Sequence, residues 1–312
     1  MPTSKSNSRV IGITLGDPGG IGPEVVAKAL SRSAVRRLAN FVVIGDEAAC
    51  ALPRSTAVSR YLVDGLGAGG ARIGKTSVVN GRAALRYLEA AVDLLKSRRI
   101  DALVTAPVSK EAIMLSKSSF IGHTEFLAEA FDTAEVGMMF VNGPLRTIIC
   151  TRHIPLKDVP KAVTTEAVLT AIRLVDRALK AHFGIRRPRI AVCGLNPHAG
   201  ESGRMGTEEK TVIGPALSRA RRGGITATGP FAADTLFIPS RLADYDCVVA
   251  MYHDQGLIPV KTLAFDSVVN LTIGLPFVRT SPAHGTAFDI AGKDMADPAS
   301  MIAAIRVACE LG

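Results

Sequence analysis

The sequence predicts a doubly wound α/β protein, and three observations support that fold class. Apolar segments with strand character alternate along the whole chain with segments of helical period, as in repeated βαβ units. The strand segments are continuously apolar, which is typical of a sheet covered by helices on both faces. The chain has 312 residues, more than one hydrophobic core usually organises, so we expect one large or two ordinary α/β domains.

The individual elements follow from these patterns in chain order. Largely apolar segments with β-type residues predict strands at 10–15, 41–44, 100–106, 138–141, 145–151, 189–195, 247–252 and 268–273. Apolar residues spaced three and four apart predict helices at 23–31, 81–98, 124–131, 164–182, 207–221 and 298–311. The first helix is expected to start at Pro23, because proline is favoured in the first turn.

Composition excludes several classes of protein. Hydrophobic residues make up 47% of the chain and charged residues 21%, which is ordinary for a globular protein. No stretch approaches the ~20 apolar residues that a membrane helix needs. Residues 1–9 are polar and lack the apolar core of a signal peptide. The five scattered cysteines form no CxxC pair and are expected to be buried and reduced. We therefore expect a cytoplasmic protein with no membrane contact.

The net charge of +9 suggests an anionic partner, either a nucleic acid or a small substrate. Nucleic-acid binding usually needs clustered basic residues interleaved with aromatic ones. Tryptophan is absent, aromatic residues make up 5%, and the basic pairs stand apart near the ends of predicted helices. A basic nucleic-acid module is therefore the weaker alternative, and a small anionic substrate is the expected partner.

The histidines are the most informative feature of the sequence. Five of the six lie in turn-like segments between predicted strands and helices, and these five are His123, His153, His198, His253 and His284. Ligands in open α/β sheets bind outside the carboxyl ends of strands, where His153, His198 and His253 are expected to lie. Three neutral imidazoles are suitable ligands for Zn²⁺ and similar divalent ions. A histidine taken alone is usually a hydrogen-bonded structural residue, and it is the placement of three at equivalent strand ends that favours a metal site.

Two segments are candidates for phosphate recognition. In Gly122–Glu125, Thr124 is placed to cap the following helix, whose free amides would bind an anion. The segment Gly69–Thr76 matches the P-loop pattern, which would imply a phosphotransferase that uses Lys75. A P-loop needs a buried strand directly before it and a helix at its Lys-Thr pair. Because 61–66 is a poor strand, we interpret this match as coincidental.

The last third of the chain carries a dense polar set. It comprises Lys261, Asn270 and Arg279, followed by the segment 284–293 with the sequence HGTAFDIAGK. Arginine grips carboxylate and phosphate groups with two parallel hydrogen bonds, whereas lysine acts as a point charge. These residues are therefore candidates for binding an anionic substrate.

At these residues the sequence resembles the 4-hydroxythreonine-4-phosphate dehydrogenases of vitamin B6 biosynthesis over nearly its whole length. The matching segments are GDPGGIGPE at 16–24, GHTEF at 122–126, GLNPHAGE at 194–201, MYHDQG at 251–256 and NLTIGLPFVRTSPAHGTAFDIAGK at 270–293. The last segment is also similar to the cofactor loop of isocitrate and isopropylmalate dehydrogenases.

The resemblance implies two α/β/α domains with a cleft between them, in the isocitrate/isopropylmalate dehydrogenase-like fold. The first domain would comprise 1–130 and 275–312, and the second would comprise 131–274 with the metal ligands and the dimer interface. The expected assembly is a homodimer with active sites at the subunit interface.

The resemblance also implies roles for individual residues. The metal ligands fall on His153, His198 and His253. The substrate contacts fall on His123, Thr124, Lys261, Asn270 and Arg279. The cofactor, NAD or NADP, would be bound partly by the loop that carries His284, Gly285, Thr286 and Asp289. One divalent ion per subunit is expected, and zinc, magnesium and cobalt all remain open.

The implied reaction is the oxidation and decarboxylation of 4-phosphooxy-L-threonine to 3-amino-2-oxopropyl phosphate. Asp234 and Asp254 are the acidic candidates for taking up the proton or supporting a metal ligand, and the sequence does not choose between them. Relatives that oxidise D-threonate or D-erythronate 4-phosphate, or an aromatic dihydrodiol, leave two alternative substrate classes open.

Overall fold

The computed structural model describes residues 9–117, 119–263 and 265–312, which form two compact units. Unit 1 contains the described residues up to Asp132 together with Leu275–Gly312, and unit 2 contains Thr133–Gly274. Residues 1–8, on which the expectation about export rests, lie outside the described part. No helix in the described part is long and apolar enough to cross a bilayer.

Unit 1 is built on a parallel sheet with the strand order β3-β2-β1-β4-β11. Its strands are β1 (Val10–Thr14), β2 (Asn40–Gly45), β3 (Val58–Leu62), β4 (Ala102–Thr105) and β11 (Val278–Pro282). All residues of β4 and β11 are buried, as in central strands of a sheet covered on both faces; the sequence of β4 is largely apolar, whereas that of β11 is mostly polar. Loops that follow these strands therefore meet at one edge of the sheet.

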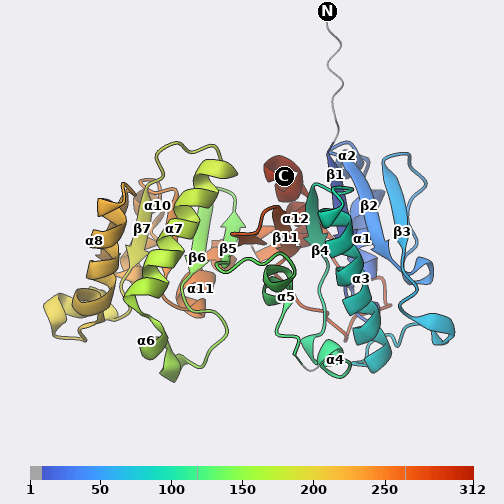
Figure 1. Cartoon of the computed structure of the whole chain (residues 1–312), viewed down its shortest axis with the longest axis horizontal. Coiled ribbons are helices and arrows are strands. Elements are labelled where there is room, and N and C mark those ends of the chain that lie inside the picture. Colours follow the sequence, from blue (N-terminus) through green and yellow to red (C-terminus); the bar gives the residue numbers. More distant parts are fainter. Residues whose placement is uncertain (1–8, 118, 264) are drawn as a thin grey trace, which may run out of the picture. The chain divides into compact units, whose positions relative to one another are not determined.

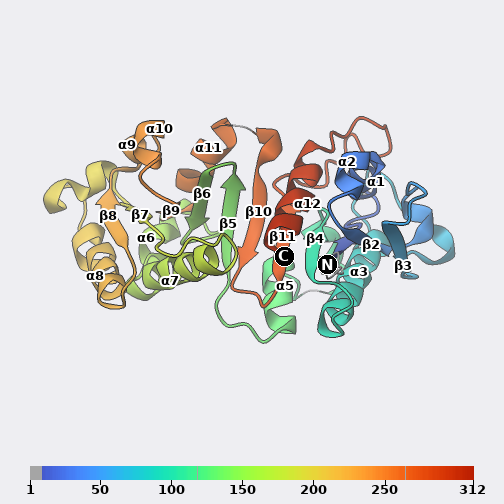
Figure 2. The ribbon, with the colours of Figure 1, turned by 90° about the horizontal axis from the view of Figure 1, so that it is seen from above.

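The helices of unit 1 cover both faces of that sheet, with α3 on one face and α1 and α12 on the other (Figure 2). They are α1 (Gly22–Ser31), α2 (Ser33–Arg36), α3 (Val78–Lys96), α4 (Lys110–Met114), α5 (His123–Ala130) and α12 (Ala299–Leu311). Short 3₁₀ turns lie at Glu47–Ala49 and Gly67–Gly69.

Unit 2 has the strand order β10-β5-β6-β9-β7-β8. Its strands are β5 (Gly137–Asn142), β6 (Leu145–Ile149), β7 (Ile190–Cys193), β8 (Ala227–Phe231), β9 (Cys247–Ala250) and β10 (Val269–Ile273). β5 is antiparallel to both of its neighbours, whereas β6, β9, β7 and β8 are parallel to one another. The carboxyl ends of β6, β9 and β7 therefore lie side by side.

The helices of unit 2 also cover two faces, with α7 and α8 on one and α9 to α11 on the other (Figures 1 and 2). The α-helices are α6 (Val159–Ala162), α7 (Thr165–Ala181), α8 (Gly214–Arg222), α9 (Ala233–Leu236), α10 (Pro239–Leu242) and α11 (His253–Leu263). Short 3₁₀ turns lie at Leu156–Asp158, Pro197–Gly203 and Phe265–Ser267, and a π-turn at Glu209–Ile213 precedes α8.

The predicted strands and helices are confirmed with ends shifted by a few residues, and the missed elements have physical reasons. β3 is a sheet edge with a half-exposed sequence, so it lacks an apolar run. β8 contains Gly229 and Pro230, and α11 contains Pro259, which are residues that normally argue against a strand interior or a helix. The helix predicted at 207–221 is divided into the π-turn and α8.

Candidate active site

Three histidines lie on loops at one edge of the unit 2 sheet. His153 follows β6, His198 follows β7, and His253 begins α11 directly after β9. Because β9 pairs in parallel with both β6 and β7, these three loops leave the sheet from neighbouring carboxyl ends. The placement of these histidines after strands is as the sequence predicts.

Hydrogen bonds from the protein backbone hold these loops to one another. The backbone N–H and the hydroxyl of Thr151 both donate to the carbonyl of Met251, at 3.1 and 2.8 Å. The Gln255 amide accepts from the N–H of Met251 at 2.7 Å and donates to the carbonyl of Gly194 at 2.8 Å. The turn before His253 is thus tied to the loop of His153 on one side and to that of His198 on the other.

The loop that carries His198 has an unusual backbone. His198 to Ser202 all have φ between +40° and +78°, and only Gly200 among these five residues is a glycine. The buried carboxylate of Glu209 accepts hydrogen bonds from the backbone N–H groups of Leu195 at 2.8 Å and Asn196 at 2.7 Å. Left-handed backbone costs free energy for residues other than glycine, so the loop needs support. The carboxylate of Glu209 provides that support at the start of the loop.

His153 and His253 lie close together, with ring centroids 5.7 Å apart. The Nδ1 atom of His253 lies 2.7 Å from a carboxylate oxygen of Asp254. Such a carboxylate fixes the ring orientation of a metal-binding histidine and leaves Nε2 as the ligand atom. Of the two acidic candidates from the sequence, Asp254 is thus the one in contact with His253.

The donor types of these three loops suit a divalent ion, but one chain supplies an incomplete set. Within the described residues, no group of three or more His, Cys, Asp or Glu side chains is placed to hold a metal ion. His198 therefore does not complete a three-histidine site with His153 and His253 in a single chain.

Both acidic candidates line one cavity of unit 2. Asp234, from α9, and Asp254, from α11, face a space of about 470 Å³ that is also lined by Tyr252 and Gln255. The structure thus brings the two carboxylates to the same cavity next to the histidine loops.

Unit 1 contains a buried cationic group at the carboxyl end of its own sheet. Arg279, on β11, is 2% exposed, and its Nε and Nη2 atoms donate to the hydroxyl of Thr105 at 3.1 and 2.5 Å. Burial lowers the pKa of Arg279 to about 10, and the nearby carboxylate of Glu125 opposes that shift. The guanidinium is therefore still charged at neutral pH.

His123, the first residue of α5, adjoins this arginine. Its Nε2 atom is buried and has no hydrogen-bond partner among the described residues. Burial holds the pKa of His123 well below its usual range, and the positive charges of Arg279 and Lys110 lower that pKa further. The ring is therefore neutral at pH 7, beside two cations.

The start of α5 adds hydrogen-bond donors to this group. Thr124 was expected to cap the helix, but the helix begins one residue earlier, with Gly122 at the capping position and no side-chain cap. Thr124 is buried in the first turn. An uncapped helix start beside Arg279, Lys110 and His123 is suited to binding a phosphate or a carboxylate.

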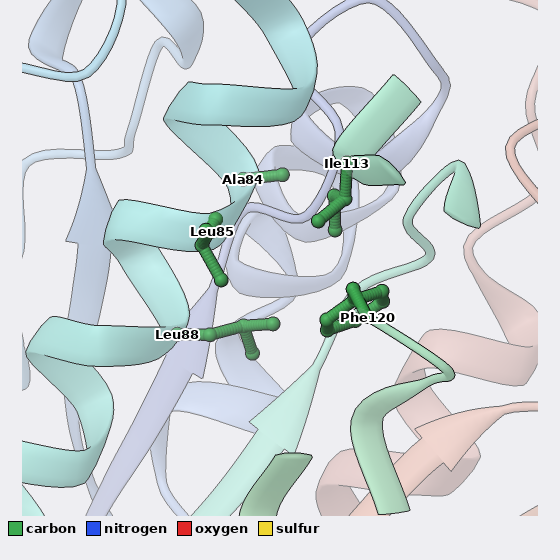
Figure 3. Close-up of a cluster of buried hydrophobic side chains, with 5 residues drawn as sticks. All are labelled: Ala84, Leu85, Leu88, Ile113 and Phe120. Carbon is green, nitrogen blue, oxygen red and sulfur yellow. The ribbon is translucent and has the colours of Figure 1, made fainter. Parts of the chain in front are cut away.

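A hydrophobic cluster holds the segment that leads into α5. Phe120 is 4% exposed and packs with Leu85 and Leu88 of α3 and with Ile113 of α4 (Figure 3). Its ring centroid lies 6.1 Å from that of Phe126 on α5. The cluster therefore anchors both ends of the turn that presents His123.

The predicted cofactor loop also lies at the carboxyl edge of the unit 1 sheet, against the glycine-rich turn after β1. The backbone N–H of Ile21 donates to the carbonyl of Thr286 at 2.9 Å. His284 places Nδ1 3.0 Å from the carbonyl of Gly285, and its buried Nε2 has no partner in the described part of the chain. Asp289 and Gly285 are exposed.

Asp17, in the turn after β1, is a buried carboxyl that sequence reasoning missed. One of its oxygens accepts from the N–H of Gly19 at 2.8 Å, and the other is also buried. Burial raises the pKa of Asp17 from 3.8 to about 6, although the N–H groups of Gly19 and Ser109 oppose the shift.

Replacing Asp17 with asparagine is expected to change how stability depends on pH. The raised pKa means that the wild-type free energy of unfolding falls as pH rises from about 4 to 6, by about 3 kcal/mol. The asparagine of Asp17→Asn does not titrate, so this loss is absent in the variant. Urea unfolding should therefore show a smaller decrease in the free energy of unfolding between pH 4.5 and pH 7.5 for the variant than for the wild type. Equal decreases in the two proteins would contradict the burial argument.

The two remaining predicted substrate contacts belong to unit 2. Lys261 lies in the last turn of α11, and Asn270 lies on β10, where its side-chain oxygen is buried without a partner in the described part. The structure thus places His123, Thr124 and Arg279 in unit 1 and these two residues in unit 2.

Several residues that build these sites were not singled out from the sequence. Lys110 and Thr105 flank the carboxyl end of β4, so the strand-end rule that found the histidines could have found them. Gln255 and Glu209 act on backbone groups of distant loops, and no local pattern in the sequence indicates such partners.

The fold and the site together indicate an α/β protein that carries histidines on loops at the carboxyl ends of parallel strands. A second group of residues, around the buried Arg279, is suited to binding an anion. The family model for the pyridoxal phosphate biosynthetic protein PdxA matches residues 24–308. The chain belongs to this family. The known activity of the family is a metal-dependent oxidation and decarboxylation in pyridoxal phosphate biosynthesis.

Individual relatives agree with this assignment. The chain is 47% identical to the 4-hydroxythreonine-4-phosphate dehydrogenase of Burkholderia vietnamiensis, covering 96% of this chain and 95% of the relative. It is similar to the solved structure of that enzyme from Klebsiella pneumoniae, with a TM-score of 0.89, 38% identity and 99% of each chain covered. A terephthalate 1,2-cis-dihydrodiol dehydrogenase from Burkholderia xenovorans has a TM-score of 0.67 and 32% identity, with 97% and 98% covered. The predicted family, fold class and oxidoreductase class are confirmed.

Proposed function

We propose that this chain oxidises and decarboxylates 4-phosphooxy-L-threonine to 3-amino-2-oxopropyl phosphate, with NAD or NADP as hydride acceptor. The observation that carries the proposal is the cationic group of unit 1, in which the buried Arg279 and the exposed Lys110 adjoin a neutral His123 at the start of α5. This group supplies the charge and the directed donors that a terminal phosphate needs. Family membership supports the same substrate.

The substrate is positioned by residues with separate tasks. Arg279 supplies a guanidinium that Thr105 holds in place, and His123 supplies an imidazole nitrogen that has no partner of its own. Thr124 and the free amides of α5 add donors. Lys261 and Asn270 remain predicted contacts, and the buried side-chain oxygen of Asn270 needs a donor such as a substrate hydroxyl or amine.

A divalent ion would be held by His153 and His253 of one chain and by His198 of a second chain. When bound, such an ion lowers the pKa of an alcohol and stabilises negative charge that develops during decarboxylation. Asp254 orients His253 through its 2.7 Å contact. Asp234 lines the same cavity but makes no such contact with His253. Its carboxylate is therefore the one of the two that is available to take up the hydroxyl proton.

The positions of exposed large apolar side chains in unit 2 support the participation of a second chain. These side chains accompany the three histidine loops, and they are Ile154 at 39%, Leu156 at 70%, Met205 at 44%, Ile258 at 63% and Leu263 at 58% exposed. Apolar side chains exposed around an incomplete ligand set are expected at a subunit interface. A homodimer would cover them and complete the ligand set together.

The cofactor would be bound by His284, Gly285, Thr286 and Asp289. The orphaned Nε2 of His284 and the open space over Gly285, where an added Cβ would meet nothing within 4 Å, fit a ligand at this loop. NAD and NADP both remain candidates, as do zinc, magnesium and cobalt for the ion. A cytoplasmic location, expected from the sequence, is part of the same proposal.

A second candidate function is suggested by the similarity to the dihydrodiol dehydrogenase structure. Four-carbon sugar-acid phosphates form a third substrate class with the same phosphate. A terephthalate dihydrodiol carries carboxylates, which Arg279, Lys110 and His123 could also bind. Family membership, and not the charge of this group, therefore favours the phosphorylated substrates.

The proposed function is tested by NADH or NADPH formation, measured by absorbance at 340 nm, with a panel of substrates. The panel contains 4-phosphooxy-L-threonine, D-threonate and D-erythronate 4-phosphate, and a cis-dihydrodiol, each with and without a chelator. We expect the highest kcat/KM with 4-phosphooxy-L-threonine and loss of turnover in chelator. A higher kcat/KM with another substrate would reassign the enzyme, and full turnover in chelator would refute the metal site.

A further inference from the structure

The segment that resembles a P-loop has a different structure and a different set of neighbours. β3 ends at Leu62, well before Gly69, and α3 begins at Val78, beyond Lys75 and Thr76. The segment is therefore not a P-loop, since neither a strand nor a helix is joined to it as that motif requires.

This segment interlocks with the two other loops at the carboxyl edge of unit 1. The N–H of Gly74 donates to the carbonyl of Gly19 at 2.8 Å. A Cβ added at Gly74 would lie 3.1 Å from the carbonyl oxygen of Phe288, and one added at Gly292 would lie 2.9 Å from Ile73. The segment 72–75 thus packs directly against the predicted cofactor loop.

One buried amide holds the backbone of both cations in this segment. The side chain of Asn80 is fully buried, accepts from the N–H of Arg72 at 3.0 Å, and donates to the carbonyl of Arg72 at 2.8 Å and that of Lys75 at 3.2 Å. A buried amide that makes three such bonds fixes the local backbone. Arg72 and Lys75 are therefore presented from a rigid support.

The charges of these two residues are not neutralised by the protein. Both side chains are exposed, and neither forms an ion pair within the described part of the chain. The only hydrogen bond of the Arg72 guanidinium in that part runs to the carbonyl of Gly69 at 3.2 Å. Two fixed cations without a carboxylate partner, beside a loop with an orphaned histidine nitrogen, suit an anionic ligand.

From this arrangement we propose that Arg72 and Lys75 bind a phosphate group of the nicotinamide dinucleotide held by the loop 284–289. The inference rests on the proposed function, because it requires the cofactor to occupy that loop. Two phosphates of the cofactor could be the partner: the pyrophosphate, which NAD and NADP share, or the 2′-phosphate, which only NADP carries. Both are recognised by the same guanidinium and ammonium chemistry.

The test is a calorimetric titration of the full-length protein with NADH, NADPH, ADP and 2′,5′-ADP. The variants are Arg72→Met, Lys75→Met and the double variant. Their exposed side chains can be removed without touching the bonds of Asn80, which are made to the backbone. Arg37→Met is the matched control, since Arg37 is an exposed cation near the start of β2, at the opposite edge of the sheet.

We expect the double variant to bind its preferred nucleotide about tenfold or more weakly, and Arg37→Met to bind it normally. A loss confined to NADPH and 2′,5′-ADP identifies the 2′-phosphate, and a loss for all four nucleotides identifies the pyrophosphate. Lys75→Arg should recover most of the affinity lost in Lys75→Met.

Unchanged affinities in the double variant, with a thermal unfolding midpoint like that of the wild type, would overturn the inference and leave the cofactor site standing. A wild-type protein that binds none of the four nucleotides would instead overturn the cofactor site, and the inference with it.

Discussion

Replacing Arg279 with lysine is expected to raise KM for the phosphorylated substrate by roughly 10- to 100-fold, with a much smaller effect on kcat. Losing a charge-assisted hydrogen bond costs about 1.5–3 kcal/mol, which corresponds to that range. Lysine keeps the charge but loses the planar fork that binds two oxygens at once. The measurement is steady-state kinetics with 4-phosphooxy-L-threonine at saturating cofactor.

The structure provides a graded control for this experiment. Thr105 holds the guanidinium through its hydroxyl, so Thr105→Ser should keep KM close to the wild-type value and Thr105→Val should raise it. Arg279 is almost fully buried, so the thermal unfolding midpoint of each variant must be compared with that of the wild type. An unchanged KM in a folded Arg279→Lys protein would remove Arg279 from the substrate site.

Replacing His198 with alanine is expected to abolish metal-dependent turnover while leaving the fold intact. His198 is exposed, and Glu209 holds the start of its loop through backbone groups, so the loop does not depend on the imidazole. His253→Ala should have the same effect, because either change leaves two imidazoles for the ion. Turnover and metal content, measured together, check both variants.

Mixing the His198→Ala and His253→Ala proteins tests whether the three histidines that bind the ion come from one chain or from two. If His198 completes the site of the partner, a hybrid dimer has one intact site and one site with both changes. An equal mixture, reassembled at random, should then recover about a quarter of the wild-type activity, since half of the dimers are hybrids with one active site each. No recovery after verified subunit exchange would place all three ligands in one chain.

Much of the site could be predicted from the sequence, since strand ends are visible in it. The apolar runs that become β6, β7 and β9 are each followed within a few residues by a histidine, and their parallel pairing places the three loops at one edge. The GHTE segment likewise marks the start of α5, although the helix begins at His123 and leaves Thr124 inside the first turn.

What the sequence did not show depends on contacts between distant segments. Arg279 is buried on a central strand whose residues Arg-Thr-Ser-Pro resemble a surface loop, so β11 was missed. His198 lies in a left-handed stretch whose start Glu209 holds, and such a backbone conformation has no local sequence signal. The segment that matches the P-loop pattern is instead held by Asn80, whose side chain bonds to the backbone of Arg72 and Lys75.

The incomplete ligand set of one chain has a consequence for how the enzyme behaves at low concentration. Two imidazoles hold a divalent ion far less tightly than three, so an isolated chain would surrender its ion to any competing chelator. Specific activity would then fall on dilution and return on concentration. In the proposed two-chain metal site, activity would therefore depend on protein concentration, and a newly synthesised chain would gain it only on dimerisation.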